Sequence, residues 1–480
     1  MRNLSKEVVN KKTAPIKVMQ FGEGNFLRAF VDWIIQKMND SGNYNGHVVV
    51  VQPLEFGRVK ELSEQDGLFT LYLQGLNNGE VVKTHEVIDV LDDFINPYSQ
   101  YDKFLKYAES EDLEVVISNT TEAGIVLDAT DVEHNTTPRT FPGKVVALLK
   151  HRYDFFNGNP DKGLSFICCE LIDNNGDELK KCVLGLVDIL GYGPDFIKWI
   201  NESCHFTSTL VDRIVPGYPR DEINEITEEL GYVDHSIVKG EIFHLWVLKS
   251  EEHIEKVFPC HTVGLNAIYA ESIKPYKQRK VKILNGCHTA MVPVAYLYGI
   301  DTVKESVLDE YVGKFVKTLV YDEIVPTIDL PKDDMISFAN SVFERYLNPF
   351  VRHELMSIAL NSISKYKARV LPSVKDYLDI KGVLPRHPLF SLASLIKFYE
   401  GNRNGETIKL NDDPSYLEFF KEVYSNGYSN EEIITKVLSN ENFWGEDLCA
   451  IPSLKDAVLG YFNKISEKGM VEALKEFVGE

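Results

Sequence analysis

The sequence lacks the cysteine spacing of a disulfide framework or a zinc site. Its seven cysteines include no CxxC pair, and their number is odd. Secreted disulfide-rich domains and structural zinc sites pair or cluster their cysteines. We therefore expect buried free thiols, as in proteins of a reducing compartment.

Long apolar runs are also missing. No stretch approaches the roughly 18 consecutive apolar residues of a membrane-spanning helix. The N-terminal residues MRNLSKEVVNKKTAPIKVMQF contain no apolar segment followed by a cleavage site, so we expect no signal peptide. Both absences predict a cytoplasmic protein that does not contact a membrane.

The sequence has fewer basic residues than acidic residues. The 480 residues include 51 Lys and Arg against 72 Asp and Glu, which gives a formal net charge of −21. Nucleic acids and anionic membranes attract basic surfaces, so the charge argues against binding to either. A small anionic substrate remains compatible, because one local cationic pocket can outweigh the overall field.

The rest of the composition is that of an ordinary globular protein. Hydrophobic residues make up 44% and charged residues 26%, which argues against a disordered, collagen-like or coiled-coil chain. A chain of this length is expected to fold as two or three domains.

The first half of the chain alternates strand and helix patterns. Apolar residues recur at helical spacing over 25–40. Short apolar runs predict buried strands at 16–21, 47–51, 113–118 and 164–169. Strands of this kind alternating with helices predict an α/β fold with a parallel sheet covered on both faces. Alternation on both sides of a GLNNG turn, at 68–74 and 79–90, predicts an inserted antiparallel hairpin.

The second half has mainly helical periodicity. The predicted helices span 302–325, 333–346, 352–368, 388–401, 416–426, 430–439 and 453–478. The pattern changes after about residue 235, without a clear linker. We therefore predict an α/β domain over 1–235 and a mostly α-helical domain over 236–480.

A glycine-rich turn joins the first strand to the first helix. It reads Gly22-Glu23-Gly24-Asn25-Phe26-Leu27-Arg28. Such a turn lets the backbone and the helix N-terminus approach a pyrophosphate. The third glycine of GxGxxG is replaced by Leu27, so a purely structural tight turn is the alternative. The candidate cofactor contacts in this segment are Gly22, Gly24, Asn25, Phe26 and Arg28.

Polar residues follow the strands where ligands bind in open α/β sheets. The second strand lacks the usual ribose-binding acid, so either Glu55 takes that role or Gln52 bonds the ribose instead. The choice between NAD and NADP is left open by this segment. After strand 113–118 we expect Thr120, Thr121 and Glu122 to contact nicotinamide or ribose.

Residue types suited to acid/base chemistry occur together in one segment, Lys280-Val281-Lys282-Ile283-Leu284-Asn285-Gly286-Cys287-His288. A desolvated lysine can exchange a proton with an alcohol or ketone oxygen, more readily if Lys282 lies close. Asn285 and His288 can donate hydrogen bonds to the same oxygen. In a regular helix Lys280 and Asn285 lie about 140° apart, so an irregular turn must bring them together. The alternative is a solvated lysine and a capping asparagine.

These segments resemble the ordered motifs of the long-chain polyol dehydrogenases, the mannitol dehydrogenase family. The similar segments are GEGNFLRA at 22–29, LVDRIVP at 210–216, EIFHLWV at 241–247, KVKILNGCH at 280–288, and RYLNPF and SISKYKARVLP up to residue 372. The resemblance implies an NAD-dependent, metal-independent enzyme with an N-terminal Rossmann-type domain and a mostly α-helical C-terminal domain. It assigns the acid/base role to Lys280, and binding of the reacting oxygen to Asn285 and His288.

Within the family, SNTTEAGI and CELIDNNGD are most similar to the members that act on hexuronates. This implies interconversion of D-tagaturonate and D-altronate. Many polyol members have Asp-Asn where this chain has Glu170-Leu171, so Asn174 or Asn175 is expected to supply the missing donor.

A uronate carboxylate also needs cations. Polyol members carry an arginine where this chain has Ser357, whereas their lysine is retained as Lys365. The candidate carboxylate ligands are Arg352, Lys365 and Arg369.

Three other functions compete with this interpretation. The same chemistry on fructuronate would give mannonate, since the two ketouronates differ at one stereocentre. A non-catalytic NADH-binding protein would bind cofactor without turnover. A metal-dependent uronate isomerase would need a ligand set that the sequence lacks, since His244 and His261 have no metal-binding spacing.

Overall fold

The computed structural model describes residues 1–132 and 136–479, which form two compact units. The first unit comprises Met1–Gly75 and Val81–Ile273, and the second comprises Leu76–Glu80 and Lys274–Glu480. The structure therefore divides the chain at residue 273, later than the boundary predicted near residue 235.

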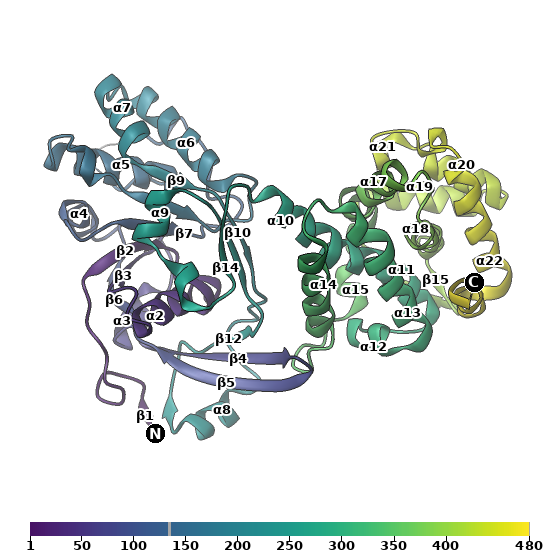
Figure 1. Cartoon of the computed structure of the whole chain (residues 1–480), viewed down its shortest axis with the longest axis horizontal. Coiled ribbons are helices and arrows are strands. Elements are labelled where there is room, and N and C mark those ends of the chain that lie inside the picture. The colour runs from purple at the N-terminus through teal and green to yellow at the C-terminus, as the bar shows by residue number, and fades with distance from the viewer. Residues whose placement is uncertain (133–135, 480) are drawn as a thin grey trace. The chain divides into compact units, whose positions relative to one another are not determined.

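The first unit is built on a six-stranded parallel sheet (Figure 1). Its strands are β2 (Ile16–Phe21), β3 (His47–Val51), β6 (Leu91–Ile95), β7 (Val115–Ser118), β8 (Ser165–Cys168) and β9 (His205–Thr207). Their order across the sheet is β6-β3-β2-β7-β8-β9. Counted along the chain this is 3-2-1-4-5-6, the order of dinucleotide-binding α/β folds, and the order reverses between β2 and β7.

Both faces of this sheet are covered, as the apolar strands predict. Along β3, Val48 and Val50 belong to one hydrophobic core, whereas Val49 and Val51 belong to another. The first core includes residues of the helix after β2, and the second includes residues of α5 and α6, which lie side by side in Figure 1. The α- and π-helices of this unit are α1 (Asn25–Leu27), the π-helix η1 (Arg28–Asp32), α2 (Trp33–Asp40), α3 (Val59–Glu64), α4 (Tyr101–Lys106), α5 (Phe141–Phe155), α6 (Asn175–Leu190), α7 (Pro194–Ser203), α8 (Ile223–Leu230) and α9 (Glu252–Val257).

Two smaller sheets extend the first unit past residue 235. The predicted hairpin strands, β4 (Phe69–Asn77) and β5 (Glu80–Ile88), are neighbours, and β12 (Val238–Glu241) pairs with β4. The other sheet contains β10 (Thr209–Asp212), β13 (Leu245–Lys249) and β14 (Ala267–Ala270). A further pair joins β1 (Arg2–Asn3) to β11 (Tyr232–Val233). Since β12 and β13 pair with strands of the first half, the unit cannot end at residue 235.

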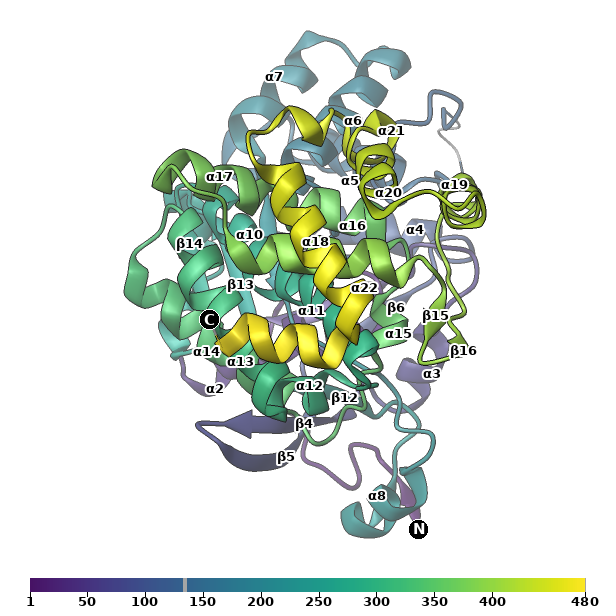
Figure 2. The ribbon, with the colours of Figure 1, turned by 90° about the vertical axis from the view of Figure 1, so that its right-hand side faces the viewer.

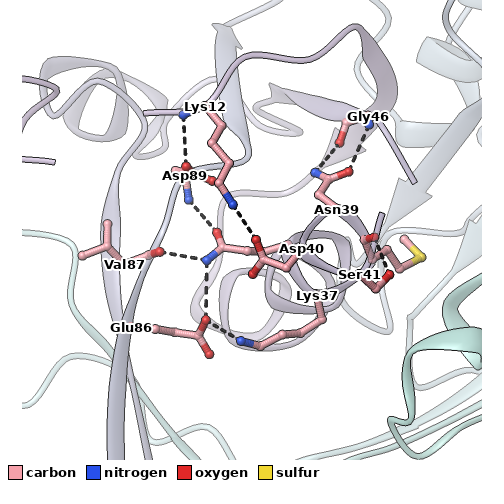
Figure 3. A network of polar contacts seen from close by, with 11 residues as sticks. Lys12, Lys37, Asn39, Asp40, Ser41, Gly46, Glu86, Val87 and Asp89 are labelled. Carbon is pink, nitrogen blue, oxygen red and sulfur yellow. Dashed lines mark hydrogen bonds and ion pairs between the residues drawn. The ribbon is translucent and has the colours of Figure 1, made fainter. Parts of the chain in front are cut away.

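A polar network fastens the end of α2 to the strand β5 (Figure 3). Lys37 forms an ion pair of 2.6 Å with Glu86, and Gln36 donates to the backbone oxygen of Val87 at 2.9 Å. The side chain of Lys12 pairs with Asp40 at the last residue of the helix. These contacts hold in place the helix that follows the glycine-rich turn.

The second unit is mostly helical (Figure 2). Its long helix α22 (Leu454–Gly479), interrupted at Gly469, packs against α18 (Arg386–Phe398), which in turn packs against α11 (Cys287–Tyr298). Its other α-helices, π-helices and strands are α10 (Lys274–Arg279), the π-helices η5 (Lys280–Gly286) and η6 (Leu319–Ile324), α12 (Val303–Leu308), α13 (Glu310–Thr318), α14 (Lys332–Tyr346), α15 (Leu355–Ile358), α16 (Ser362–Arg369), α17 (Leu371–Lys381), α19 (Pro414–Ser425), α20 (Asn430–Leu438), α21 (Glu441–Trp444), β15 (Asn402–Arg403) and β16 (Glu406–Thr407). Each helix predicted from residue 302 onward has a counterpart here.

The seven cysteines are free thiols, as predicted, and all except the half-buried Cys449 are buried. Over residues 1–132 and 136–479, no helix has the length and hydrophobicity needed to cross a membrane.

Candidate active site

The glycine-rich turn follows β2 directly. Gly22 has φ +123°, and a Cβ atom there would lie 2.9 Å from Leu27 Cδ1 and 3.3 Å from the backbone oxygen of Asn119. Only glycine fits this position without strain. Leu27, which replaces the third glycine of the fingerprint, is buried and packs against Gly22. The departure from GxGxxG therefore keeps a tight turn.

Gly24 lies on the solvent-exposed side of the same turn. It is exposed, and a Cβ atom there would meet nothing within 4 Å. The helix that begins at Asn25 has no side-chain cap, so its first N–H groups are available to an anion.

Arg28, predicted to contact the cofactor, has several partners within the chain. It is buried, and its guanidinium group donates to the backbone oxygens of Glu23 and Ser236 and to Asn25 Oδ1. Burial lowers the pKa of Arg28 to about 10. Arg28 thus holds the turn in shape and Asn25 helps to anchor it, while Phe26 stacks on Phe30 with ring centroids 5.0 Å apart.

A buried carboxyl group lies beneath the turn. Gln20 Nε2 donates to the backbone oxygen of Gly22 at 3.1 Å and to Asp32 Oδ2 at 3.5 Å. Within the described part of the chain, Gln20 Oε1 and Asp32 Oδ1 have no partner. Burial raises the pKa of Asp32 to about 7, because a desolvated carboxylate is costly.

The loop after β3 contains the two predicted ribose contacts. Gln52 is buried, and its amide nitrogen donates to the backbone oxygens of Leu54 and Glu55, both at 2.9 Å. The residue Glu55 is itself exposed. The structure thus uses the amide group of Gln52 to shape the loop.

The loop after β7 is tied to the end of β8. Glu170 is buried and accepts hydrogen bonds from Thr120 N, Thr120 Oγ1 and Ser118 Oγ at 2.9, 3.0 and 3.1 Å. Burial raises the pKa of Glu170. Thr121 has φ +68°, which is unusual for a β-branched residue and typical of functional loops. Thr121 and the adjacent Glu122 are exposed.

The two asparagines after β8 differ in environment. Asn175 is fully buried, and its amide nitrogen donates to the backbone oxygens of Cys168, Glu170 and Thr209. This residue is therefore structural. Asn174 is exposed, with φ +52° at the start of α6, so of the two candidate donors only Asn174 faces solvent.

The acid/base segment of the second unit contains the irregularity that its spacing requires. Residues Lys280–Gly286 form a π-helix, and α11 continues from Cys287. In a π-helix hydrogen bonds join residues five apart, so Lys280 and Asn285 lie one above the other. Lys280, Asn285 and His288 are each half-buried.

Lys282 has a separate role. Its ammonium group forms a 2.6 Å ion pair with Asp376 and donates to the backbone oxygen of Thr327 at 2.9 Å. These contacts anchor η5. The partners of Lys282 are Asp376 and Thr327, so they do not support the expectation that Lys282 lowers the pKa of Lys280.

His288 has the most distinctive environment in this unit. Its ring lies 4.3 Å from the ring of Tyr346 and 5.0 Å from that of His353, between centroids. Its Nε2 atom is buried and has no hydrogen-bond partner in the described residues. Burial lowers the pKa of His288 well below its usual value, and His353, Arg345 and Arg369 lower it further. The imidazole is therefore uncharged at neutral pH, with one polar atom left for a ligand.

Two of the three predicted carboxylate ligands are close to this segment. Helix α16 contacts η5 and α11, and a Cβ atom on Gly286 would lie 2.8 Å from the backbone oxygen of Arg369. Lys365 and Arg369 are half-buried and lie one turn apart on α16. Neither forms an ion pair within residues 1–132 and 136–479, although Lys365 donates to the backbone oxygen of Ile358 at 2.8 Å.

Arg352 is placed differently. It is exposed and pairs with Glu354 at 2.5 Å, so its charge is already balanced at the surface. Arg345 and His353, which the sequence did not predict as site residues, lower the pKa of His288. The only sequence signal for Arg345 was its place in RYLNPF, and nothing in the spacing connected that motif to residue 288.

No cluster of three or more His, Cys, Asp or Glu side chains that could hold a metal ion occurs in the part of the chain that the structure describes.

Comparison with known proteins identifies the family. The Mannitol dehydrogenase Rossmann domain profile matches residues 16–258, and the Mannitol dehydrogenase C-terminal domain profile matches residues 272–465. The chain is 46% identical over 477 residues to the altronate oxidoreductase of Phocaeicola vulgatus, covering 99% of each protein. It is 44% identical to the altronate oxidoreductase of Bacillus subtilis, covering 99% of this chain and 98% of that protein.

Solved structures agree on the fold. A D-sorbitol dehydrogenase in substrate-free form matches with a TM-score of 0.80 at 20% identity, covering 99% of this chain and 100% of that one. Pseudomonas fluorescens mannitol 2-dehydrogenase, in a ternary complex with NAD and D-mannitol, matches with a TM-score of 0.69 at 20% identity over the whole of both chains. With both domain profiles matched in order, this chain belongs to the mannitol dehydrogenase family.

Proposed function

We propose that this chain is an NAD-dependent altronate oxidoreductase, which interconverts D-altronate and D-tagaturonate. Relatives of that name, 42–46% identical over 99% of the chain, support the reaction. The observation that carries the proposal is the environment of His288. Its buried Nε2 atom has no partner in the described residues, and the nearby half-buried Arg369, which lowers its pKa, forms no ion pair in that part of the chain.

The first unit fits a dinucleotide. Gly24 is exposed with open space in front of its Cα atom, and the helix start behind it has no side-chain cap. An anionic pyrophosphate there would receive N–H hydrogen bonds and the favourable end of the helix dipole. Thr120 and Thr121 follow β7, at the point where the strand order reverses, which is where such folds hold the reactive part of the cofactor. A dinucleotide bound there would supply the hydride acceptor for the oxidation of altronate and the hydride donor for the reduction of tagaturonate.

The second unit supplies proton transfer and charge stabilisation. Lys280 donates a proton to the ketone oxygen in reduction and removes it in oxidation. Asn285 and the uncharged His288 donate hydrogen bonds to that oxygen as negative charge develops on it. A neutral imidazole suits this role because it keeps an N–H donor without adding a second full charge beside the lysine.

The cations on α16 suit a uronate rather than a polyol. Lys365 and Arg369 are half-buried, so their charges are partly desolvated and gain from an anionic ligand. A substrate carboxylate provides that anion, and an arginine can bind it in a bidentate manner.

The test is to mix purified protein with NADH and tagaturonate and to follow the loss of NADH absorbance. We expect turnover with tagaturonate to exceed turnover with fructuronate, and NADH formation with altronate and NAD. Folded protein that oxidises NADH no faster than the enzyme-free mixture would refute the proposal. Faster turnover with fructuronate would reassign the substrate to the other ketouronate.

A further inference from the structure

The loop after β3 raises the question of how this chain selects its dinucleotide. In this fold an acid at the end of the second strand bonds the ribose hydroxyls and repels the 2′-phosphate of NADP. That position is occupied here by Gln52, whose amide nitrogen is committed to the backbone oxygens of Leu54 and Glu55. The ribose-binding acid must therefore come from elsewhere if the chain is selective.

The carboxylate that the structure brings to the end of β3 belongs to Glu23, in the glycine-rich turn. Glu23 Oε1 accepts a hydrogen bond from the backbone nitrogen of Arg58 at 3.1 Å. A Cβ atom on Gly57 would lie 2.2 Å from Glu23 Oε1 and 2.5 Å from Gln52 Cδ. Gly57 thus has no room for a side chain, because Glu23 and Gln52 converge on it.

The other carboxylates near this loop are placed less well for the role. Glu55 is exposed, and its backbone oxygen, rather than its side chain, is the group that contacts Gln52. Glu61 pairs with the guanidinium group of Arg58 at 2.8 Å. Glu23 is more enclosed than either, and its position joins the pyrophosphate turn to the end of the second strand.

We propose that Glu23 is the residue that selects NAD over NADP in this chain. Its carboxylate accepts a hydrogen bond from the adenosine 2′-hydroxyl of NAD and repels the 2′-phosphate of NADP. In this chain the acid that contacts the ribose is thus located between Gly22 and Gly24 and not at the end of the second strand. This inference rests on the proposed dinucleotide-dependent function.

Glu23→Gln is the direct test, because glutamine keeps an oxygen for Arg58 N and removes only the charge. The dissociation constants of NADH and NADPH are measured by cofactor fluorescence, together with kcat/KM for each cofactor. Removing one short-range repulsion is expected to reduce the preference for NADH by about tenfold or more. Glu64→Gln, an equal charge change on an exposed residue of α3, should leave the preference unchanged.

Gly57→Ala provides a second test that does not alter charge. The added methyl group must displace the Glu23 carboxylate or the Gln52 side chain, so the preference should fall in the same direction. Thermal melting verifies that each variant is folded.

The outcomes separate this inference from the proposed function. Wild-type protein that binds neither cofactor refutes both. Wild-type protein that reduces tagaturonate with NADH, while Glu23→Gln keeps the wild-type preference, refutes the role of Glu23 alone. A relaxed preference in Glu55→Gln instead of Glu23→Gln assigns the role to Glu55 and also overturns the inference.

Discussion

At the residue scale, the chemistry proposed for the second unit uses side chains from three elements that contact one another, η5, α11 and α16. Lys280 and Asn285 share the π-helix, and His288 follows in the first turn of α11. Lys365 and Arg369 lie on α16, which contacts both of these elements. Each of these side chains makes a distinct contribution, so substitutions should separate proton transfer from substrate binding.

Lys280→Ala removes the proposed proton donor. We expect kcat to fall by about 10²–10⁴-fold, the usual contribution of a general acid or base. The dissociation constant of NADH should remain close to the wild-type value. Stopped-flow turnover and fluorescence titration measure the two quantities, and added methylamine should restore part of the activity. Near-normal turnover would remove Lys280 from the acid/base role.

Arg369→Ala removes one cation of α16. A charge-assisted hydrogen bond contributes about 1.5–3 kcal/mol, so KM for tagaturonate should rise by about 10- to 150-fold. A ketohexose, which lacks the carboxylate, should react much as it does with the wild type. Lys367→Ala is the matched control, because Lys367 is exposed on the same helix. An equal loss for both substrates would show that Arg369 has only a structural role.

At the element scale, the two glycines of the glycine-rich turn are constrained for different reasons, one by the fold and the other by access for a ligand. Gly22 is constrained by its backbone conformation and by Leu27, whereas Gly24 is constrained only by what approaches from outside. We therefore expect the glycine at position 22 to serve folding and the glycine at position 24 to serve binding.

Two alanine variants test this separation. Gly22→Ala should lower both the melting temperature and the affinity for NADH, because φ +123° disfavours alanine and its methyl group meets Leu27. Gly24 has φ −67° and open surroundings, so Gly24→Ala should leave the melting temperature unchanged. The affinity for NADH should fall about tenfold or more, because the added methyl group would lie in the contact with the ligand. Unchanged NADH affinity in Gly24→Ala would place the pyrophosphate elsewhere.

Most elements could be predicted because their patterns are local. The runs at 16–21 and 47–51 became β2 and β3, and the helix predicted over 25–40 is present, with a π-helical segment inside it. The strand β6 was missed because Asp92 and Asp93 interrupt its apolar pattern at the edge of the sheet. The strand β9 was missed because it has only three residues.

The other differences between the predicted and the observed structure arise from contacts between residues far apart in the sequence. The extent of the first unit depends on β12 and β13, which pair with strands far earlier in the chain. The neighbours of His288, Arg345 and His353, lie on segments that only the folded chain brings near it. For the same reason the partners of Arg28 could not be predicted, since no sequence pattern reveals that Ser236 accepts from its guanidinium group.

At the scale of the whole molecule, the buried Asp32 connects stability to pH. Its pKa is about 7 in the folded chain against 3.8 ordinarily. Between these values the folded state retains a proton that the unfolded state has lost, so this group reduces stability as pH rises, by about 1.4 kcal/mol per unit. Above pH 7 its contribution is constant.

Asp32→Asn should therefore be more stable than the wild type, by an amount that grows from pH 5 to pH 7 and then levels off. Asparagine can also donate to Gln20 Oε1, which has no partner in the described residues. Melting temperatures of both proteins across this pH range give the difference. A difference that does not vary with pH would contradict the protonation of Asp32.

Because buried thiols occur in both units, their reactivity can be used to follow local unfolding of the chain. Cys168, Cys169, Cys182, Cys204 and Cys260 lie in the first unit, and Cys287 and Cys449 lie in the second. A buried sulfur reacts with an alkylating reagent only when its surroundings unfold locally. Mass spectrometry of the alkylated peptides, taken over time, would thus distinguish local opening around Cys287 in the second unit from opening of the first unit, in the unaltered enzyme and without any attached probe.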